Sequence, residues 1–182
     1  MPNALLPPER PPDRSIVLVG LMGVGKSTVG RRLARRLALP FVDSDEEIER
    51  AADHEIKEIF DRFGEASFRD GERRVLRRLI AGERKVIATG GGAFMDPGTR
   101  ALILDRCIAI WLEAETETLA ERVTRRGNRP LLAGKDPLPL LRELAEIRNP
   151  VYAEAHLRVL SEAGPHERTV ERILEALAEH VR

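Results

Sequence analysis

The chain has 182 residues, and its 30 lysines and arginines are balanced by 30 aspartates and glutamates. This length suits one domain with a core that needs no disulfide or metal to hold it together. The zero net charge excludes an overall attraction to nucleic acid or to an anionic membrane, and a single cysteine, Cys107, excludes an internal disulfide.

The first 13 residues form a proline-rich tail, with Pro2, Pro7, Pro8, Pro11 and Pro12. Prolines lack the backbone donor that helices and sheets need, so we expect a flexible tail without a function of its own. It has no basic-then-apolar signal pattern, and no later stretch has the length of a membrane span. We therefore expect one domain over residues 14–182 in a cytoplasmic protein.

A strand, a glycine-rich loop and a helix follow the tail. Residues 16–19 are β-branched or aliphatic, and residues 20–28 read Gly-Leu-Met-Gly-Val-Gly-Lys-Ser-Thr. After them, Val29, Leu33 and Leu37 repeat at helical spacing. The loop matches the phosphate-binding pattern G-x-x-x-x-G-K-[ST] in its proper structural context. We predict that Lys26 meets the β- and γ-phosphates of a nucleotide, and that the Ser27 hydroxyl binds Mg²⁺.

Two acidic residues follow the second expected strand, at residues 39–43. Asp43 ends that strand, and Ser44 with Glu47 suggests a capping box at the start of a helix that carries Asp45 in its first turn. Carboxyl ends of parallel strands line the ligand crevice, so both acids should lie beside the phosphate loop.

Further candidate site residues lie on the expected helix over residues 54–81 and directly after the strand that follows this helix. Arg69 follows Phe68 directly, so it should lie at the margin of the buried face. A strand over residues 85–88 ends at Gly90-Gly91-Gly92. Three glycines are entropically costly, and they suit a backbone that passes close to a ligand or a neighbouring loop.

The remaining chain continues the alternation of helices and strands. We expect helices over residues 97–104, 116–126, 138–148 and 170–181, strands over 107–112 and 157–160, and a breaker-rich lid over 127–137. The helix over 138–148 should stop at Asn149-Pro150, and His166 should be a surface residue at a helix start. Such alternation predicts an α/β fold, a parallel sheet with helices on both faces.

A phosphate loop alone allows a small-molecule kinase, a nucleotide-driven switch or motor, or a binding module without chemistry. The chain lacks the N-K-x-D guanine-reading motif of switches and the apolar strand ending in an Asp-Glu pair that motors usually have. Its short length, its lid and its acids after the second strand favour a small kinase.

Six ordered motifs resemble those of the shikimate kinase family and cover almost the whole chain after the tail. They are the segments 20–28, 41–48, 64–69 (Gly-Glu-Ala-Ser-Phe-Arg), 90–93 (Gly-Gly-Gly-Ala), 129–132 (Arg-Pro-Leu-Leu) and 148–152 (Arg-Asn-Pro-Val-Tyr). The resemblance implies a P-loop three-layer sandwich like that of nucleoside monophosphate kinases, with a five-stranded parallel sheet in the order 2-3-1-4-5. It also implies Mg²⁺-dependent transfer of the γ-phosphate of ATP to the 3-hydroxyl of shikimate, by a protein that we expect to be monomeric.

The resemblance also assigns roles to individual residues. Nucleotide binding falls to Gly23, Val24, Gly25, Lys26, Ser27, Thr28 and Arg129. Shikimate binding falls to Asp45, Gly91 and the carboxylate-binding arginines Arg69 and Arg148, and catalysis to Lys26, Asp43 and the lid residue Arg129.

Two questions stay open at this stage. Either Asp43 or Asp45 could take the proton of the attacking hydroxyl, and Arg122, Arg125 or the loop 163–166 could face the adenine. One alternative function is that of a gluconate kinase, which shares the phosphate loop but should lack arginines at the positions of Arg69 and Arg148. A non-catalytic nucleotide-binding module is the second alternative.

Overall fold

The computed structural model describes residues 12–126 and 136–181. The elements in these two ranges, in chain order, are β1 (Ile16–Val19), α1 (Lys26–Leu37), β2 (Phe41–Asp43), α2 (Ser44–Ala52), α3 (Ile56–Ala81), β3 (Val86–Ala88), the 3₁₀ turn η1 (Ala93–Met95), α4 (Pro97–Arg106), β4 (Ile108–Glu113), α5 (Thr116–Arg126), α6 (Pro137–Tyr152), β5 (Leu157–Leu160) and α7 (His166–His180).

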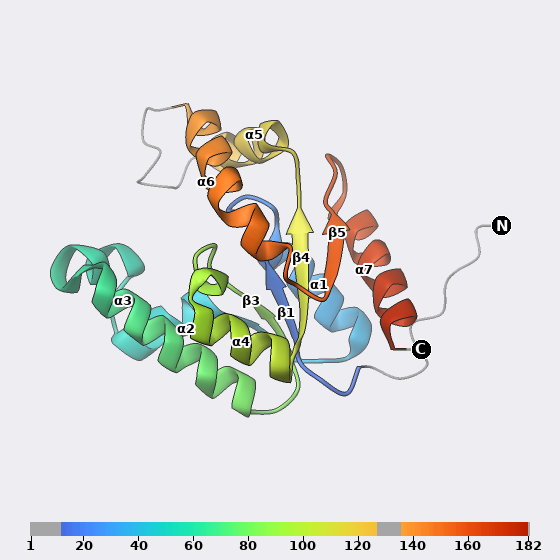
Figure 1. Cartoon of the computed structure of the whole chain (residues 1–182), viewed down its shortest axis with the longest axis horizontal. Coiled ribbons are helices and arrows are strands. Elements are labelled where there is room, and N and C mark those ends of the chain that lie inside the picture. Colours follow the sequence, from blue (N-terminus) through green and yellow to red (C-terminus); the bar gives the residue numbers. More distant parts are fainter. Residues whose placement is uncertain (1–11, 127–135, 182) are drawn as a thin grey trace.

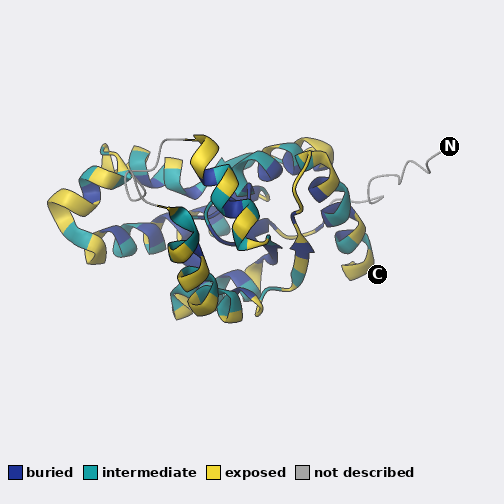
Figure 2. Cartoon of the chain, turned by 90° about the horizontal axis from the view of Figure 1, so that it is seen from above, coloured by how far each residue is buried: buried dark blue, intermediate teal, exposed yellow. Residues whose placement is uncertain are grey.

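The strands form one parallel sheet in the order β2-β3-β1-β4-β5, which confirms the expected order. β1 is the central strand, and its residue Ile16 is in register with Val86 of β3 and Ile108 of β4. Helices cover both faces, with α1 and α7 on one side and α3 and α4 on the other (Figure 1). Buried residues are concentrated in the sheet and on the inward faces of the helices (Figure 2).

The sheet order brings three connecting segments together at one end of the sheet. Because β2, β3 and β1 are neighbours and run parallel, the start of α2, the triglycine segment and the phosphate loop all leave from the same end. The Thr89 hydroxyl donates to the Leu18 carbonyl over 2.8 Å and ties the end of β3 to that of β1. In Figure 1, α5 and α6 lie beyond this same end of the sheet.

The start of α2 differs from the prediction. The N-cap is Asp43, whose side chain accepts from the backbone N–H groups of Asp45 and Glu46, so the capping box of Ser44 and Glu47 is wrong. Ser44 is the first residue of the helix, and its buried hydroxyl has no partner among the described residues. A carboxylate suits this position because it adds charge–dipole attraction to the cap hydrogen bonds.

The bounds of α6 also differ. The predicted stop at Arg148 is wrong, because the helix continues to Tyr152 with Pro150 inside its last turn. A proline there removes one hydrogen bond, and the Ala153 N–H still closes the helix on the Asn149 carbonyl over 2.9 Å. Pro137, predicted in the lid, is the first residue of α6, whereas residues 127–135 lie outside the described residues.

Both ends of the domain show smaller differences. The sequence predicts a flexible tail through residue 13. In the structure Pro12 is buried, and its carbonyl accepts a hydrogen bond from Arg84 over 2.9 Å. Residues 1–11 lie outside the described residues. α7 begins at His166, earlier than the expected residue 170. In the described ranges, no helix combines the length and the apolar character that crossing a membrane requires.

Candidate functional site

The phosphate loop has the backbone of an anion cradle. Gly20, Gly23 and Gly25 have φ values of 144°, 82° and 96°, which side chains with a Cβ rarely adopt. Gly25 is the N-cap of α1, and no side chain caps that helix. The first turn of α1 therefore presents its positive dipole end to whatever enters the loop.

Lys26 places a positive charge over the loop. Its Nζ donates to the carbonyls of Gly20 over 2.6 Å and of Leu21 over 3.0 Å. These two hydrogen bonds hold the lysine side chain against the loop.

Ser27 and Asp43 link the phosphate loop to the end of β2. The Ser27 hydroxyl donates to Asp43 Oδ2 over 2.5 Å, while Asp43 Oδ1 accepts from the Asp45 N–H over 2.9 Å. Two hard oxygen groups thus lie side by side below the loop. The described residues contain no cluster of three or more His, Cys, Asp or Glu that could hold a metal ion alone.

Asp45 occupies a recessed position between several acidic groups. Burial, followed by the charges of Asp43 and Glu72, raises the pKa of its carboxyl from 3.8 to about 6. A Cβ built on Gly90 would stand 2.8 Å from Asp45 Oδ1, so the carboxylate lies against the start of the triglycine segment.

Arg69 projects from the middle of α3, beyond a kink at Gly64 (φ 83°, ψ 169°). Its Nη1 donates to Glu72 Oε1 over 2.9 Å, and its guanidinium lies 5.1 Å from the ring centre of Phe68. Glu72 is 3% exposed, its Oε2 has no partner among the described residues, and burial raises its pKa.

Glu72 was missed in the sequence. The available signal was its i,i+3 spacing from Arg69 on a helix, which places the two side chains on one face. Without the structure, that spacing equally describes an ordinary surface ion pair, and nothing in it indicates burial.

The triglycine segment is where the predicted substrate-site residues meet. Cβ atoms built on its last two glycines would stand 3.0 Å from Arg148 Nη1, at Gly91, and 2.6 Å from Arg69 Nη1, at Gly92. With Asp45 against Gly90, one acid and two arginines from three helices therefore converge on three consecutive residues. Side chains of three helices thus approach these glycines, and so does a neighbouring loop, as expected, because a Cβ on Gly91 would stand 3.8 Å from the Gly20 carbonyl oxygen of the phosphate loop.

A cavity of about 420 Å³ lies between α5 and the turn before α7, next to the phosphate loop. Its lining residues are Thr118, Glu121, Arg122, Arg125, Arg126, Ala163, Gly164 and His166. Arg122 is committed to other contacts, since it donates to the Val24 carbonyl, the Ser161 hydroxyl and the Glu162 carbonyl.

His166 is the first residue of α7, as its sequence context suggested, but it is half-buried rather than a surface residue. A Cβ built on Gly25 would stand 2.8 Å from its Cε1, and its Nδ1 is buried without a partner among the described residues. Burial and the charges of nearby arginines lower its pKa, which favours the neutral ring. Arg129 lies outside the described residues.

The family model described as "Shikimate kinase" matches residues 22–178. A shikimate kinase of Zymomonas mobilis is 58% identical over 93% of this chain and 97% of its own length, and one of Caulobacter vibrioides is 57% identical over 90% and 82%. The solved structure of Acinetobacter baumannii shikimate kinase in complex with shikimate superimposes with a TM-score of 0.86, at 40% identity over 92% of this chain and 94% of that one. A gluconokinase from Sinorhizobium meliloti shares the fold, with a TM-score of 0.59 and 22% identity over 94% of this chain and 97% of that one.

Proposed function

The chain belongs to the shikimate kinase family, and we infer from this premise that it transfers the γ-phosphate of ATP to the 3-hydroxyl of shikimate. The products are shikimate 3-phosphate and ADP, in the synthesis of aromatic amino acids. The observation that carries the inference is the convergence of Asp45, Arg69 and Arg148 on the triglycine segment, at the same sheet edge as the phosphate loop.

Shikimate has one carboxylate and three hydroxyls, so its site needs cations at one end and acceptors at the other. We propose that Arg69 and Arg148 bind the carboxylate, because a planar guanidinium pairs with a carboxylate through two hydrogen bonds. Asp45 accepts from the ring hydroxyls, and the backbone of Gly91 contacts the ring. The buried Glu72 keeps Arg69 oriented through their 2.9 Å contact.

We propose that the nucleotide occupies the phosphate loop through Gly23, Val24, Gly25, Lys26, Ser27 and Thr28. The backbone N–H groups and the helix dipole bind the phosphates, and Lys26 neutralises charge that develops during transfer. The cavity beside His166 suits the nucleotide base. Because Arg122 is held by three contacts, Arg125 and His166 are the better candidates for touching the base.

Mg²⁺ is the cofactor that the loop chemistry implies. Ser27 and Asp43 fit it, because they supply neighbouring oxygen groups and Mg²⁺ takes most of its other ligands from water and phosphates. When bound, the ion would supply positive charge that offsets the charge of the phosphates. We propose Ser27 as its direct ligand and Asp43 as the acid that orients Ser27.

In the reaction, the 3-hydroxyl oxygen forms a bond to the γ-phosphorus as the bond from that phosphorus to the β–γ bridging oxygen breaks. Asp43 already accepts from the Ser27 hydroxyl and from two backbone N–H groups. Asp45, with a pKa of about 6, retains more capacity for a proton. We therefore propose that Asp45 accepts the proton of the hydroxyl. Asp43 then contributes to catalysis by orienting Ser27, the proposed Mg²⁺ ligand.

Three further assignments rest on the sequence. The resemblance gives Arg129 a contact with the transferring phosphate, within the lid that the sequence predicts before α6. We also propose that the protein works in the cytoplasm and as a monomer. Buried Cys107, whose pKa burial raises to about 11, is an unreactive thiol in keeping with a reducing compartment. Sedimentation equilibrium tests the monomer directly.

A coupled assay of ADP release tests the proposed function. Shikimate, gluconate and nucleoside monophosphates are compared as acceptors under identical conditions. We expect turnover with shikimate alone. Turnover with gluconate would instead support the related kinase, and ATP binding without turnover on any acceptor would support a binding module.

A further inference from the structure

Tyr152, in the last turn of α6, is completely buried, and its side chain has one polar atom, the hydroxyl oxygen. Its ring lies 6.5 Å from that of Phe94 and 6.1 Å from that of Trp111, and its exposed fraction is 0%. The hydroxyl donates to the Gly91 carbonyl. Because a buried hydroxyl is costly without a hydrogen bond, this contact fixes where the ring and the carbonyl lie relative to each other.

Arg148 stands one turn before Tyr152 on the same face of α6. It approaches Gly91 from the Cα side, while Tyr152 holds the carbonyl of the same residue. Arg148 also acts on the Tyr152 hydroxyl through its charge and a hydrogen bond, but burial outweighs both and raises the pKa of Tyr152 to about 12. The hydroxyl therefore keeps its proton, and remains a donor, throughout the neutral range.

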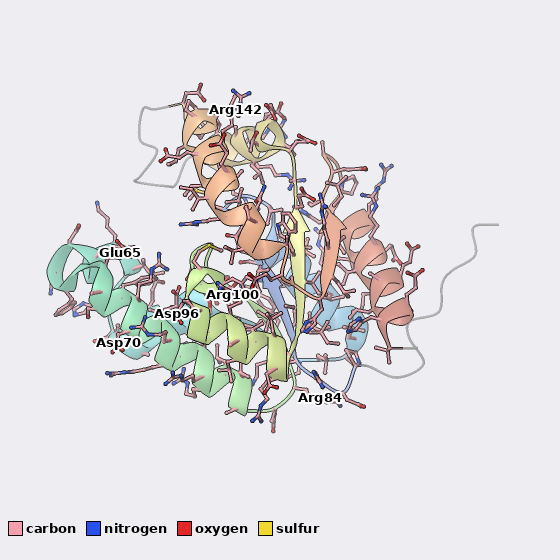
Figure 3. The ribbon with its side chains drawn as sticks, viewed as in Figure 1. Glu65, Asp70, Arg84, Asp96, Arg100 and Arg142 are labelled. Carbon is pink, nitrogen blue, oxygen red and sulfur yellow. The ribbon has the colours of Figure 1, made fainter. Side chains whose placement is uncertain are left out.

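Arg100, which projects from α4 (Figure 3), forms a second connection, between the turn after the triglycine segment and the residues after α6. Its Nη1 donates to the carbonyls of Phe94, over 3.1 Å, and Met95, over 3.3 Å. Its Nε lies 2.7 Å from Glu154 Oε2, just beyond α6. The end of α6 is thus attached both to the triglycine segment and to the turn that follows it.

We propose that Tyr152 is a positioning residue for the acceptor carboxylate, because its bond to Gly91 sets the distance between Arg148 and the triglycine segment. Arg69 lies against Gly92, one residue further along, so this single bond also sets the spacing of the two guanidinium groups. The proposal rests on the proposed function, in which those two groups bind the carboxylate of shikimate.

Tyr152→Phe removes the hydroxyl and keeps the ring. We expect the KM for shikimate to rise roughly 3- to 30-fold, the value of one hydrogen bond near a charged group. The KM for ATP and kcat should stay within about twofold, because the variant leaves the phosphate loop untouched. Leu141→Val is the matched control, since Leu141 is fully buried on the same helix about three turns earlier.

The methyl ester of shikimate separates positioning from general loosening. The wild type should bind shikimate much better than the ester, and this preference should shrink in Tyr152→Phe but not in Leu141→Val. Absence of the preference in the wild type would contradict carboxylate binding itself, and hence the proposed function. A normal preference in Tyr152→Phe, or an equal rise of both KM values, would overturn the positioning role alone.

Arg100→Gln provides an independent variant if Tyr152→Phe does not fold. It loosens the second connection while Tyr152 stays in place, so we expect a smaller loss of the same preference for shikimate over its ester. An unchanged preference in this variant, with no folded Tyr152→Phe, would also contradict the proposal.

Discussion

The guanidinium of Arg69 lies against the Cα of Gly92, so closely that a Cβ on Gly92 would stand 2.6 Å from Nη1. The backbone of Gly92 has φ −95° and ψ −9°, which alanine adopts readily. The glycine is therefore needed for the close approach of the arginine and not for an unusual backbone conformation.

Gly92→Ala should displace Arg69 without unfolding the protein. The clashing atom is the end of a flexible side chain, so the melting temperature should change little. Loss of about one charged hydrogen bond should raise the KM for shikimate roughly tenfold, as steady-state kinetics can measure. Gly98→Ala, where the nearest atom would be Asp96 Oδ2 at 3.4 Å, is the control and should leave that KM unchanged.

Lys26→Ala should abolish most of the catalysis while the fold survives. Removing a charge that stabilises the transferring phosphate should lower kcat by about 10²-fold or more. The control is Lys57→Ala. Lys57 is an exposed lysine on α3, so this variant should keep the kcat of the wild type. Near-normal turnover of Lys26→Ala would refute the phosphate-loop assignment.

Arg69→Ala and Arg148→Ala should each weaken shikimate binding much more than ATP binding. Truncating one partner of a desolvated charge pair costs roughly 2–5 kcal/mol, and lysine should restore only part of it. Isothermal titration gives both affinities. Arg74→Ala, whose side chain is 78% exposed on the same helix as Arg69, is the control. Equal losses of affinity for shikimate and for ATP would show that the two arginines have a structural role instead.

The two arginine variants should differ in stability. Arg69→Ala leaves the buried Glu72 without its cation, whereas no described ion pair is lost in Arg148→Ala. We therefore expect the lower melting temperature for Arg69→Ala.

Asp45→Asn should stabilise the protein in a pH-dependent way. The pKa of Asp45 is about 6 in place of 3.8, so the folded protein binds this proton more tightly than the unfolded chain does. The ionised carboxyl therefore destabilises the fold, by up to about 3 kcal/mol above pH 6 and by almost nothing below pH 4.

Melting curves of Asp45→Asn and wild type at pH 4 and pH 8 measure this effect. The gain in melting temperature should be large at pH 8 and near zero at pH 4, and shikimate phosphorylation should be lost at both. Asp61→Asn, at an exposed position of α3, controls for a general charge effect. An equal gain at both pH values would contradict the destabilising carboxylate.

The order of elements and the residues of the site follow from sequence because they depend on local patterns. Apolar runs predict the strands, and β5 and α5 have the expected bounds. Ordered motifs place Asp45, Arg69 and Arg148 on separate elements, and the parallel sheet then brings their ends together.

The missed features depend on contacts between elements. Asp43 replaces Ser44 as the N-cap of α2 and also accepts from Ser27 of another helix. Pro150 stays inside α6, where the buried Tyr152 holds the helix end against the triglycine segment. The burial of Glu72 and the contact of His166 with Gly25 likewise need the folded arrangement, because no short stretch of sequence contains both partners in their environment.

A crystal structure of the wild-type protein with MgADP and shikimate would test the central claim most directly. We predict the shikimate carboxylate within hydrogen-bonding distance of the guanidinium groups of Arg69 and Arg148, with a ring hydroxyl on Asp45 facing the phosphate loop. A carboxylate bound away from both arginines, or a ring turned so that no hydroxyl faces the nucleotide phosphates, would contradict it.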